Sequence, residues 1–146
     1  MTKARSGQCL CGAVRLTASS LGELGACHCK MCQRWTGGPL LGVTVKESAM
    51  EIVDLAQVVS RRTSDWASRS HCGACGSPLW YRYDKGADGA GDYEVPIGLF
   101  DDANGLTLAK EIFIDDKPDS FDFAGEHKRM TKAELMDAIA SRPEGA

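Results

Sequence analysis

The sequence predicts a mostly β fold of short antiparallel strands, closed by one C-terminal helix and stabilised by bound metal. The chain has 146 residues, so we expect a single domain over 1–146. Short apolar or alternating segments lie between clusters of turn-forming residues, which is typical of a β domain. Seven cysteines fall into three tight clusters, and that spacing is typical of metal ligands.

The predicted strands are short segments in which apolar residues alternate with polar ones or form a brief run. In chain order they cover 13–18, 40–45, 51–53, 57–64, 78–83, 92–100 and 111–114. The glycine-rich segment 85–91, KGADGAG, predicts a hairpin between the fifth and sixth of these strands. The cluster DDANG at 101–105 predicts the turn that follows.

A helix is predicted near the C-terminus, at about 131–141. Thr131 and Glu134 have the spacing of a capping box, and Leu135, Met136 and Ile139 give the segment an apolar face. The tail at 142–146, RPEGA, is expected to fray.

Charge and hydropathy exclude several classes of partner. Seventeen basic residues stand against 20 acidic ones, giving a formal charge of −3, whereas nucleic-acid binding requires clustered positive charge. No apolar run approaches the ~18 residues of a membrane helix, and the first residues lack the apolar stretch of a signal peptide. We therefore expect no nucleic-acid or membrane partner, and a cytoplasmic location that keeps the thiols reduced.

The cysteines read C-x-C, then C-x-C-x-x-C, then C-x-x-C. An odd number of cysteines without a secretion signal argues against a disulfide framework. Zinc suits four thiolates, with an iron–sulfur cluster as the rival. The steps Cys11-Gly12 and Cys75-Gly76 favour zinc, because a glycine after a ligand permits the tight turn of a zinc knuckle.

Seven ligands divide naturally into a closed site of four and an open site of three, so two zinc ions per chain are expected. The four-ligand structural site would comprise Cys9, Cys11, Cys72 and Cys75, and the open site Cys27, Cys29 and Cys32. Spacing alone also permits one ion to be shared by Cys9, Cys11, Cys27 and Cys29.

The histidines are weaker candidates than the cysteines. His28 lies between two cysteines, and in an extended segment its side chain points away from theirs, which favours a structural or substrate-facing role. His71 precedes Cys72 and would be an alternative ligand that four cysteines make unnecessary. His127, in the polar stretch EHKR, is expected to be solvated.

Three strings, GQCLCGAV, CHCKMCQRWTGG and CGACGSPLWYR, resemble the glutathione-dependent formaldehyde-activating enzyme family, which also includes centromere protein V. The similarity covers about residues 7–123. It implies a fold called a β-tent, similar to that of a small zinc protein that binds Rab GTPases. It also implies a structural zinc on Cys9, Cys11, Cys72 and Cys75, and a catalytic zinc on Cys27, Cys29 and Cys32.

The chain departs from the family pattern at three places. Gln33 stands where a basic residue is frequent, with Arg34 next. Lys110 and Glu111 stand where the family often has a proline and a histidine. The sequence 119–121, DSF, replaces a step that often contains tryptophan.

The predicted function is that of a zinc-dependent carbon–sulfur lyase or synthase acting on thiol–aldehyde adducts, with glutathione as the expected kind of thiol and formaldehyde as the family's aldehyde. No catalytic acid or base is assigned. Arg34 is the candidate for a substrate carboxylate, with a plain surface charge as the alternative. Trp35 would line a pocket or belong to the core.

Two other interpretations remain open. The first is a non-catalytic zinc module for protein partners. In that case Trp66 and the pair Arg61-Arg62 would contact the partner; otherwise Trp66 is a core residue and the two arginines are solvated. The second is a labile, redox-active cysteine triad at Cys27, Cys29 and Cys32.

Overall fold

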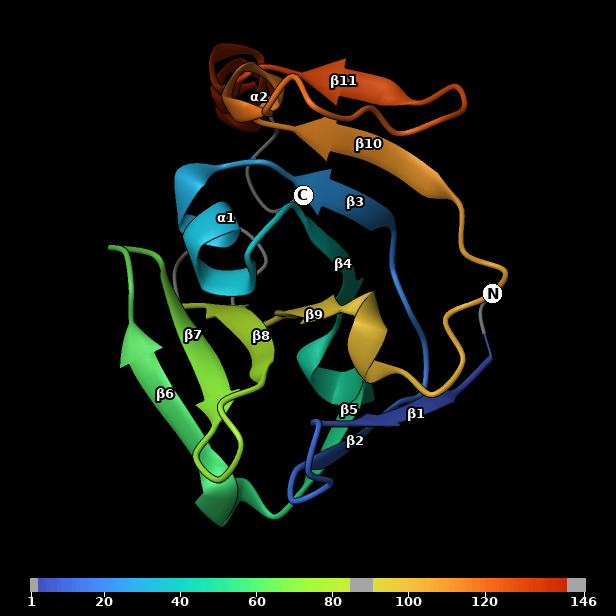
Figure 1. Ribbon diagram of the computed structural model, residues 1–146, viewed down its shortest axis with the longest axis vertical. Helices are drawn as coiled ribbons and strands as arrows, with labels where there is room; N and C mark the ends of the chain where they lie inside the picture. The colour runs from blue at the N-terminus through green and yellow to red at the C-terminus, as the bar shows by residue number, and fades with distance from the viewer. Residues whose placement is uncertain (1–2, 85–90, 142–146) are drawn as a thin grey trace. The chain divides into compact units, whose positions relative to one another are not determined.

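The computed structural model describes residues 3–84 and 91–141. Within these residues the chain forms 11 strands, two α-helices and four single-turn 3₁₀ helices, which confirms the mostly β class and the C-terminal helix (Figure 1). The chain divides into two compact units, Met1–Glu23 with Gly42–Leu106 and Leu24–Leu41 with Thr107–Ala146. We describe each unit in turn, and the single domain over 1–146 stays a prediction.

The first unit contains a small three-stranded antiparallel sheet. Its strands are β1 (Arg5–Gln8), β2 (Arg15–Ala18) and β5 (Met50–Val53), with β2 in the centre. Leu16 and Ala18 are buried, whereas Arg15 is exposed, as expected for a strand with one face toward a core. Cys9 and Cys11 lie in the turn that joins β1 to β2.

The other strands of the first unit lie in the order β4, β9, β8, β7, β6, and each is antiparallel to its neighbour. Their bounds are Leu40–Val45, Tyr93–Pro96, Pro78–Tyr83, Ala67–Cys72 and Val58–Arg62, where β4 enters this unit at Gly42. Val43, Val45, Leu79 and Val95 are fully buried. Single turns of 3₁₀ helix cover Glu47–Ala49, Leu55–Gln57 and Ile97–Leu99.

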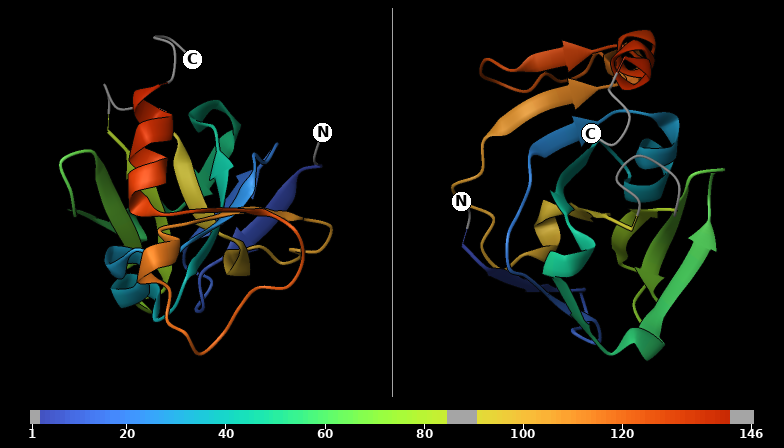
Figure 2. Two further views of the ribbon diagram at one scale, coloured as in Figure 1. Left: turned by 90° about the horizontal axis from the view of Figure 1, so that it is seen from above. Right: turned by 180° about the vertical axis from the view of Figure 1, so that it is seen from behind.

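The second unit is built on three parallel strands, with β10 (Leu108–Ile112) between β3 (Leu24–Cys27) and β11 (Lys128–Met130), as Figures 1 and 2 show. Helix α1 (Lys30–Thr36) follows β3, and helix α2 (Lys132–Ala140) follows β11. A 3₁₀ turn at Ile114–Asp116 follows β10. The register places Glu111 beside Ala26 and Ile112 beside Cys27.

Most predicted strands are present, with differences at their ends. The segments 40–45 and 78–83 match β4 and β8. The segment 92–100 is a strand only as far as Pro96, and 111–114 is wrong in its second half because Phe113 adopts a left-handed conformation (φ +55°) that ends β10. Strands β8 and β9 pair as the predicted hairpin, whereas the loop at 85–90 and the tail at 142–146 lie outside the described residues.

Helix α1 and strands β1, β3, β7 and β11 were not predicted. Helix α1 has seven residues, and its N-cap is Cys29 rather than a serine, threonine, aspartate or asparagine. In the part of the chain that the structure describes, no helix combines the length and apolar character needed to cross a membrane.

The capping box of α2 provides a test of the fold. Thr131 Oγ1 accepts a hydrogen bond from the Glu134 N–H (3.1 Å), and the Glu134 carboxylate accepts one from the Thr131 N–H (3.0 Å). We expect Thr131→Ala to lower the free energy of unfolding by about 1 kcal/mol. Glu134→Gln, which retains an acceptor, should cost less. Chemical unfolding followed by circular dichroism measures both, and equal losses would contradict this account of the cap.

Candidate functional site

Four cysteine sulfurs meet in the first unit. Cys9 and Cys11 come from the β1–β2 turn, Cys72 ends β7, and Cys75 lies in the turn before β8. The Sγ atoms of Cys9 and Cys11 are 3.7 Å apart, those of Cys11 and Cys72 are 3.8 Å apart, and all four lie within 4.8 Å of one another. Thiolates about 2.3 Å from a tetrahedral zinc are about 3.8 Å apart, so this donor set fits the ion.

The two halves of this group are built alike. The Gly12 N–H donates to the Cys9 carbonyl (3.1 Å), and the Gly76 N–H donates to the Cys72 carbonyl (2.8 Å). Both glycines have φ near +80°, a conformation that a side chain would strain. The Val14 N–H also donates to Cys9 Sγ at 3.3 Å. These turns explain why glycine follows each pair of ligands, as the zinc-knuckle interpretation requires.

The pKa values of these thiols diverge. Hydrogen bonds from the side chain and backbone of Ser77, and from the Cys11 backbone, lower the pKa of Cys75 to about 5. The Ala13 N–H acts to lower the pKa of Cys11, but desolvation and the neighbouring thiols raise it to about 11. The neighbouring thiols therefore disfavour ionisation of Cys11, and a bound cation would offset the repulsion between thiolates.

Three further sulfurs meet in the second unit. Cys27 ends β3, Cys29 caps α1, and Cys32 lies in the first turn of α1, with the three Sγ atoms within 4.8 Å of one another. The Cys32 N–H donates to Cys29 Sγ at 3.4 Å. Hydrogen bonds to Cys29 and Cys32, followed by burial, raise the pKa of Cys27. Three thiols without a fourth protein ligand in the group match the donor set of a zinc site with an open position.

The structure thus groups the cysteines as four plus three. Among the described residues, the four-cysteine group contains neither Cys27 nor Cys29. The nitrogens of His28 and His71 belong to neither group. This geometry agrees with the expectation that neither histidine is a metal ligand.

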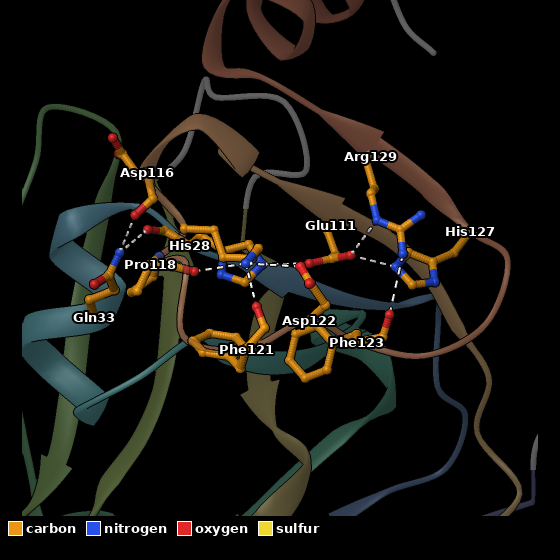
Figure 3. Close-up of polar contacts among 11 residues, drawn as sticks. His28, Gln33, Glu111, Asp116, Pro118, Phe121, Asp122, Phe123, His127 and Arg129 are labelled. Atoms are coloured by element: carbon orange, nitrogen blue, oxygen red, sulfur yellow. Dashed lines mark hydrogen bonds and ion pairs between the residues drawn. The ribbon is translucent and has the colours of Figure 1, made fainter.

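A buried carboxylate of the second unit joins two histidines (Figure 3), one of which lies between Cys27 and Cys29 in the sequence. Glu111 Oε1 lies 2.7 Å from His28 Nε2, and Glu111 Oε2 lies 2.5 Å from His127 Nε2 and 3.1 Å from Arg129 Nε. The side chains of Glu111, His28 and His127 are 1%, 0% and 2% exposed. We call these residues the Glu111 cluster: His28, Glu111, His127 and Arg129.

The Glu111 cluster corrects one expectation. His127 is not solvated. It directly precedes β11, whose parallel pairing with β10 places its side chain in a buried position against the Glu111 carboxylate. Burial acts to raise the pKa of Glu111, but hydrogen bonds from His127 and His28 outweigh it and hold that pKa below its ordinary value. The carboxylate is therefore ionised at neutral pH and is balanced by the guanidinium of Arg129.

His28 is fixed at its backbone as well as at its ring. Its N–H donates to the Ile112 carbonyl (3.1 Å), and its carbonyl accepts from Gln33 Nε2 (2.6 Å). Gln33 Nε2 also donates to the Asp116 carbonyl at 2.9 Å. His28 Nδ1 is buried and has no hydrogen-bond partner among the described residues, so Nε2 is the ring nitrogen that pairs with Glu111.

Aromatic rings from the segment 117–123 cover His28. The ring centroids of Phe121 and Phe123 lie 6.0 and 5.9 Å from that of His28. The ammonium group of Lys117 shapes this segment by donating to the carbonyls of Pro118 (2.7 Å) and Phe121 and pairing with Asp122 (3.0 Å). The segment therefore shields the His28–Glu111 contact from water.

The remaining candidate residues lie away from the sulfurs or at the surface. Arg34 is exposed on α1, two residues after Cys32. Two residues turn a helix by about 200°, so the two side chains leave α1 on opposite sides. Trp35 is half-buried, and Trp66 in the first unit is 51% exposed rather than a core residue.

One feature of the sequence indicates the Glu111 cluster. Glu111 is the only acidic residue in the apolar run EIFI, and a carboxylate in a buried strand requires partners. Its partners could not be identified, because His28 and His127 are 83 and 16 residues away. Gln33 gave no sign, since its role depends on two backbone carbonyls that only the fold brings together.

Three comparisons relate the chain to known proteins. The family model described as glutathione-dependent formaldehyde-activating enzyme matches residues 4–116. A protein of Schizosaccharomyces pombe described as an uncharacterized lyase is 33% identical over 136 residues, covering 91% of this chain and 95% of the relative. The crystal structure of a Rhodobacter sphaeroides protein matches with a TM-score of 0.55 at 19% identity, over 85% of this chain and 98% of the other, and shows a shared fold.

Removal of metal should destabilise the first unit. Because the four-cysteine group joins segments 61 residues apart, a bound ion contributes its binding energy to folding. We expect exhaustive chelation, or Cys72→Ser, to lower the melting temperature by roughly 10 °C or more, as for a loss of several kcal/mol. Ser68→Ala, on the same strand, is the control. An unchanged melting temperature after demetallation would refute the structural role.

The Glu111 cluster should make stability depend on pH. The pKa of Glu111 is lowered from 4.5 in the folded chain, so its contribution is present above pH 4.5 and is lost as the pH falls through the lower folded value. Glu111→Gln should reduce the free energy of unfolding by about 1–3 kcal/mol near pH 7, since buried donors lose their acceptor. The measurement is the difference between the urea midpoints of the two proteins from pH 7 to pH 3. That difference should narrow below pH 4.5, and a constant difference would contradict the assignment.

Proposed function

Because the chain belongs to the glutathione-dependent formaldehyde-activating enzyme family, we propose that it is a zinc-dependent carbon–sulfur lyase or synthase. Its substrates would be thiol–aldehyde adducts of the S-hydroxymethylglutathione kind. The observation that carries this proposal is the three-cysteine group, whose sulfurs lie within 4.8 Å of one another and leave a fourth tetrahedral position to a substrate. The S. pombe relative, described as a lyase, agrees with this reaction class.

In this proposal Cys27, Cys29 and Cys32 hold the catalytic zinc, and Cys9, Cys11, Cys72 and Cys75 hold the structural zinc. A zinc ion at the open site supplies a position where a substrate thiol loses its proton and is held as a thiolate. Three protein thiolates leave the site with a formal charge of about −1, which favours holding a thiol over activating water. Iron–sulfur clusters are the less favoured occupant, because the paired glycine turns fit zinc knuckles.

The reaction needs no oxidant or reductant. The thiol sulfur forms a bond to the aldehyde carbon, the carbonyl π electrons move to oxygen, and the proton lost by the thiol ends on that oxygen. The reverse reaction breaks the carbon–sulfur bond and returns the thiol and the aldehyde. We assign the proton transfers to water or to the substrate itself.

Arg34 is proposed to bind a carboxylate of the thiol substrate. Its exposure and its position across α1 from Cys32 suit a group remote from the reacting sulfur, as the carboxylates of glutathione are. Trp35, the next residue, is proposed to line the same region. Glutathione is abundant where thiols stay reduced, so the proposal includes a cytoplasmic location. It also includes the β-tent fold that the family resemblance implies.

One observation favours a second function. Trp66, Val53, Leu55 and Val59 are 51%, 51%, 64% and 41% exposed in the first unit, and large exposed apolar side chains mark many protein contacts. A non-catalytic zinc module would use such residues to bind a protein partner. Recovery of a stoichiometric partner by the wild type, lost in Trp66→Ala, would support it.

The deciding experiment compares the wild type with Cys29→Ser. We expect about two zinc ions per wild-type chain and catalysed exchange between glutathione, formaldehyde and their adduct, followed by NMR. Cys29→Ser should retain one zinc and its circular dichroism spectrum. Its turnover should fall by more than about 100-fold, which exceeds the roughly 10–100-fold losses that follow when a partner outside the ligand set is removed. Lys30→Ala, exposed on the same helix, is the matched control.

Other outcomes would redirect the proposal. Equal exchange rates with and without protein would refute catalysis for this pair of substrates. One zinc per chain together with an oxidised triad, shown by mass spectrometry, would favour a redox-active cysteine site.

A further inference from the structure

We propose that Glu111 is a positioning residue for the three-cysteine group: by holding the ring of His28, it fixes the directions in which Cys27 and Cys29 present their sulfurs. The inference rests on the metal binding proposed for that group. It concerns residues that lie outside the ligand set, and it assigns a role to a buried carboxylate that the reaction itself does not use.

The first step of the argument is the position of His28. It is the residue between two ligands, and successive side chains of an extended segment point to opposite sides. A rotation of the backbone at His28 therefore turns the Cys27 and Cys29 side chains as well. Fixing His28 fixes both ligands, whereas Cys32 is held separately by α1.

The second step is that His28 is held at three points. Ile112 accepts from its N–H, Gln33 donates to its carbonyl, and Glu111 accepts from its ring Nε2 at 2.7 Å. The first two contacts restrain the backbone but leave the ring free to turn. Glu111 alone among these three holds the ring, which is fully buried and lies against Phe121 and Phe123.

The third step is that Glu111 is itself immobile. Its second oxygen accepts from His127 and Arg129, and the strand that carries it is paired on both sides, with β3 and with β11. A carboxylate oxygen held in this way is a fixed reference point for the imidazole. Partners of this kind, one shell outside the ligands, typically change metal affinity by roughly 10–100-fold when they are lost.

The test separates positioning from general stability. Glu111→Gln keeps the shape of the side chain but offers one acceptor oxygen where the carboxylate offers two, so it cannot satisfy the N–H groups of His28 and His127 together. Lys128→Gln is the matched control, because Lys128 is exposed on β11 and does not belong to the Glu111 cluster. Thr131→Ala weakens the same unit without touching the cluster.

Each protein is loaded with ¹¹³Cd, and two quantities are measured: the ¹¹³Cd chemical shifts and the rates at which the ions pass to a chelator. The resonance absent from Cys29→Ser identifies the three-cysteine site, and the four-cysteine site is the internal reference. In Glu111→Gln we expect the three-cysteine resonance to move or broaden and its ion to leave roughly 10–100-fold faster. The four-cysteine site should not change, and Lys128→Gln and Thr131→Ala should resemble the wild type at both sites.

Three results would overturn the inference. One is a three-cysteine site in Glu111→Gln whose shift and rate match the wild type. Another is an equal change at both metal sites or in Thr131→Ala, which would show loss of stability alone. The third is a wild-type chain that binds no ion at the three-cysteine group, which would remove the proposed function as well and is distinguished by the wild-type spectrum.

A second variant covers the case in which Glu111→Gln does not fold. Gln33→Met removes the hydrogen bond to the His28 carbonyl while keeping the length of the side chain. We expect it to change the three-cysteine resonance in the same direction, and an unchanged resonance would count against control of the ligands through His28.

Discussion

The constraint on which the rest of the structure depends is the close approach of thiols that repel one another when ionised. Four sulfurs in the first unit and three in the second lie within 4.8 Å of their own group. The pKa of Cys11, which desolvation and the neighbouring thiols raise to about 11, expresses the cost of that crowding. A divalent cation bound to these thiolates would relieve the cost, and its binding would then contribute to folding.

The two groups meet the constraint in different ways. The four-cysteine group draws on two glycine turns that are distant in the sequence, and each turn orients its sulfurs through backbone hydrogen bonds. The three-cysteine group is local in the sequence and is oriented from outside, by a helix that begins at Cys29 and by the contacts of His28. The first group offers four thiols to one ion, and the second offers three.

The Glu111 cluster shows why family membership and mechanism are separate questions. The family match supports the reaction class, but it does not describe the contacts that Glu111 and Gln33 make in this chain. In this chain both residues act on His28, one on its ring and one on its carbonyl. A buried carboxylate is stable there because three N–H groups replace the water that it gave up.

The sequence alone determined the features that depend on local spacing. The cysteine clusters, the glycines after Cys11 and Cys75, strands β4 and β8 and the cap of α2 all follow from residues a few positions apart. Tertiary structure decided the rest, because it depends on contacts between distant residues. The parallel pairing of β10 with β3 and β11 carried Glu111 to His28 and buried His127. Helix α1 needed the Cys29 sulfur as its cap, and Phe113 ended β10 by a backbone conformation that its apolar side chain does not signal.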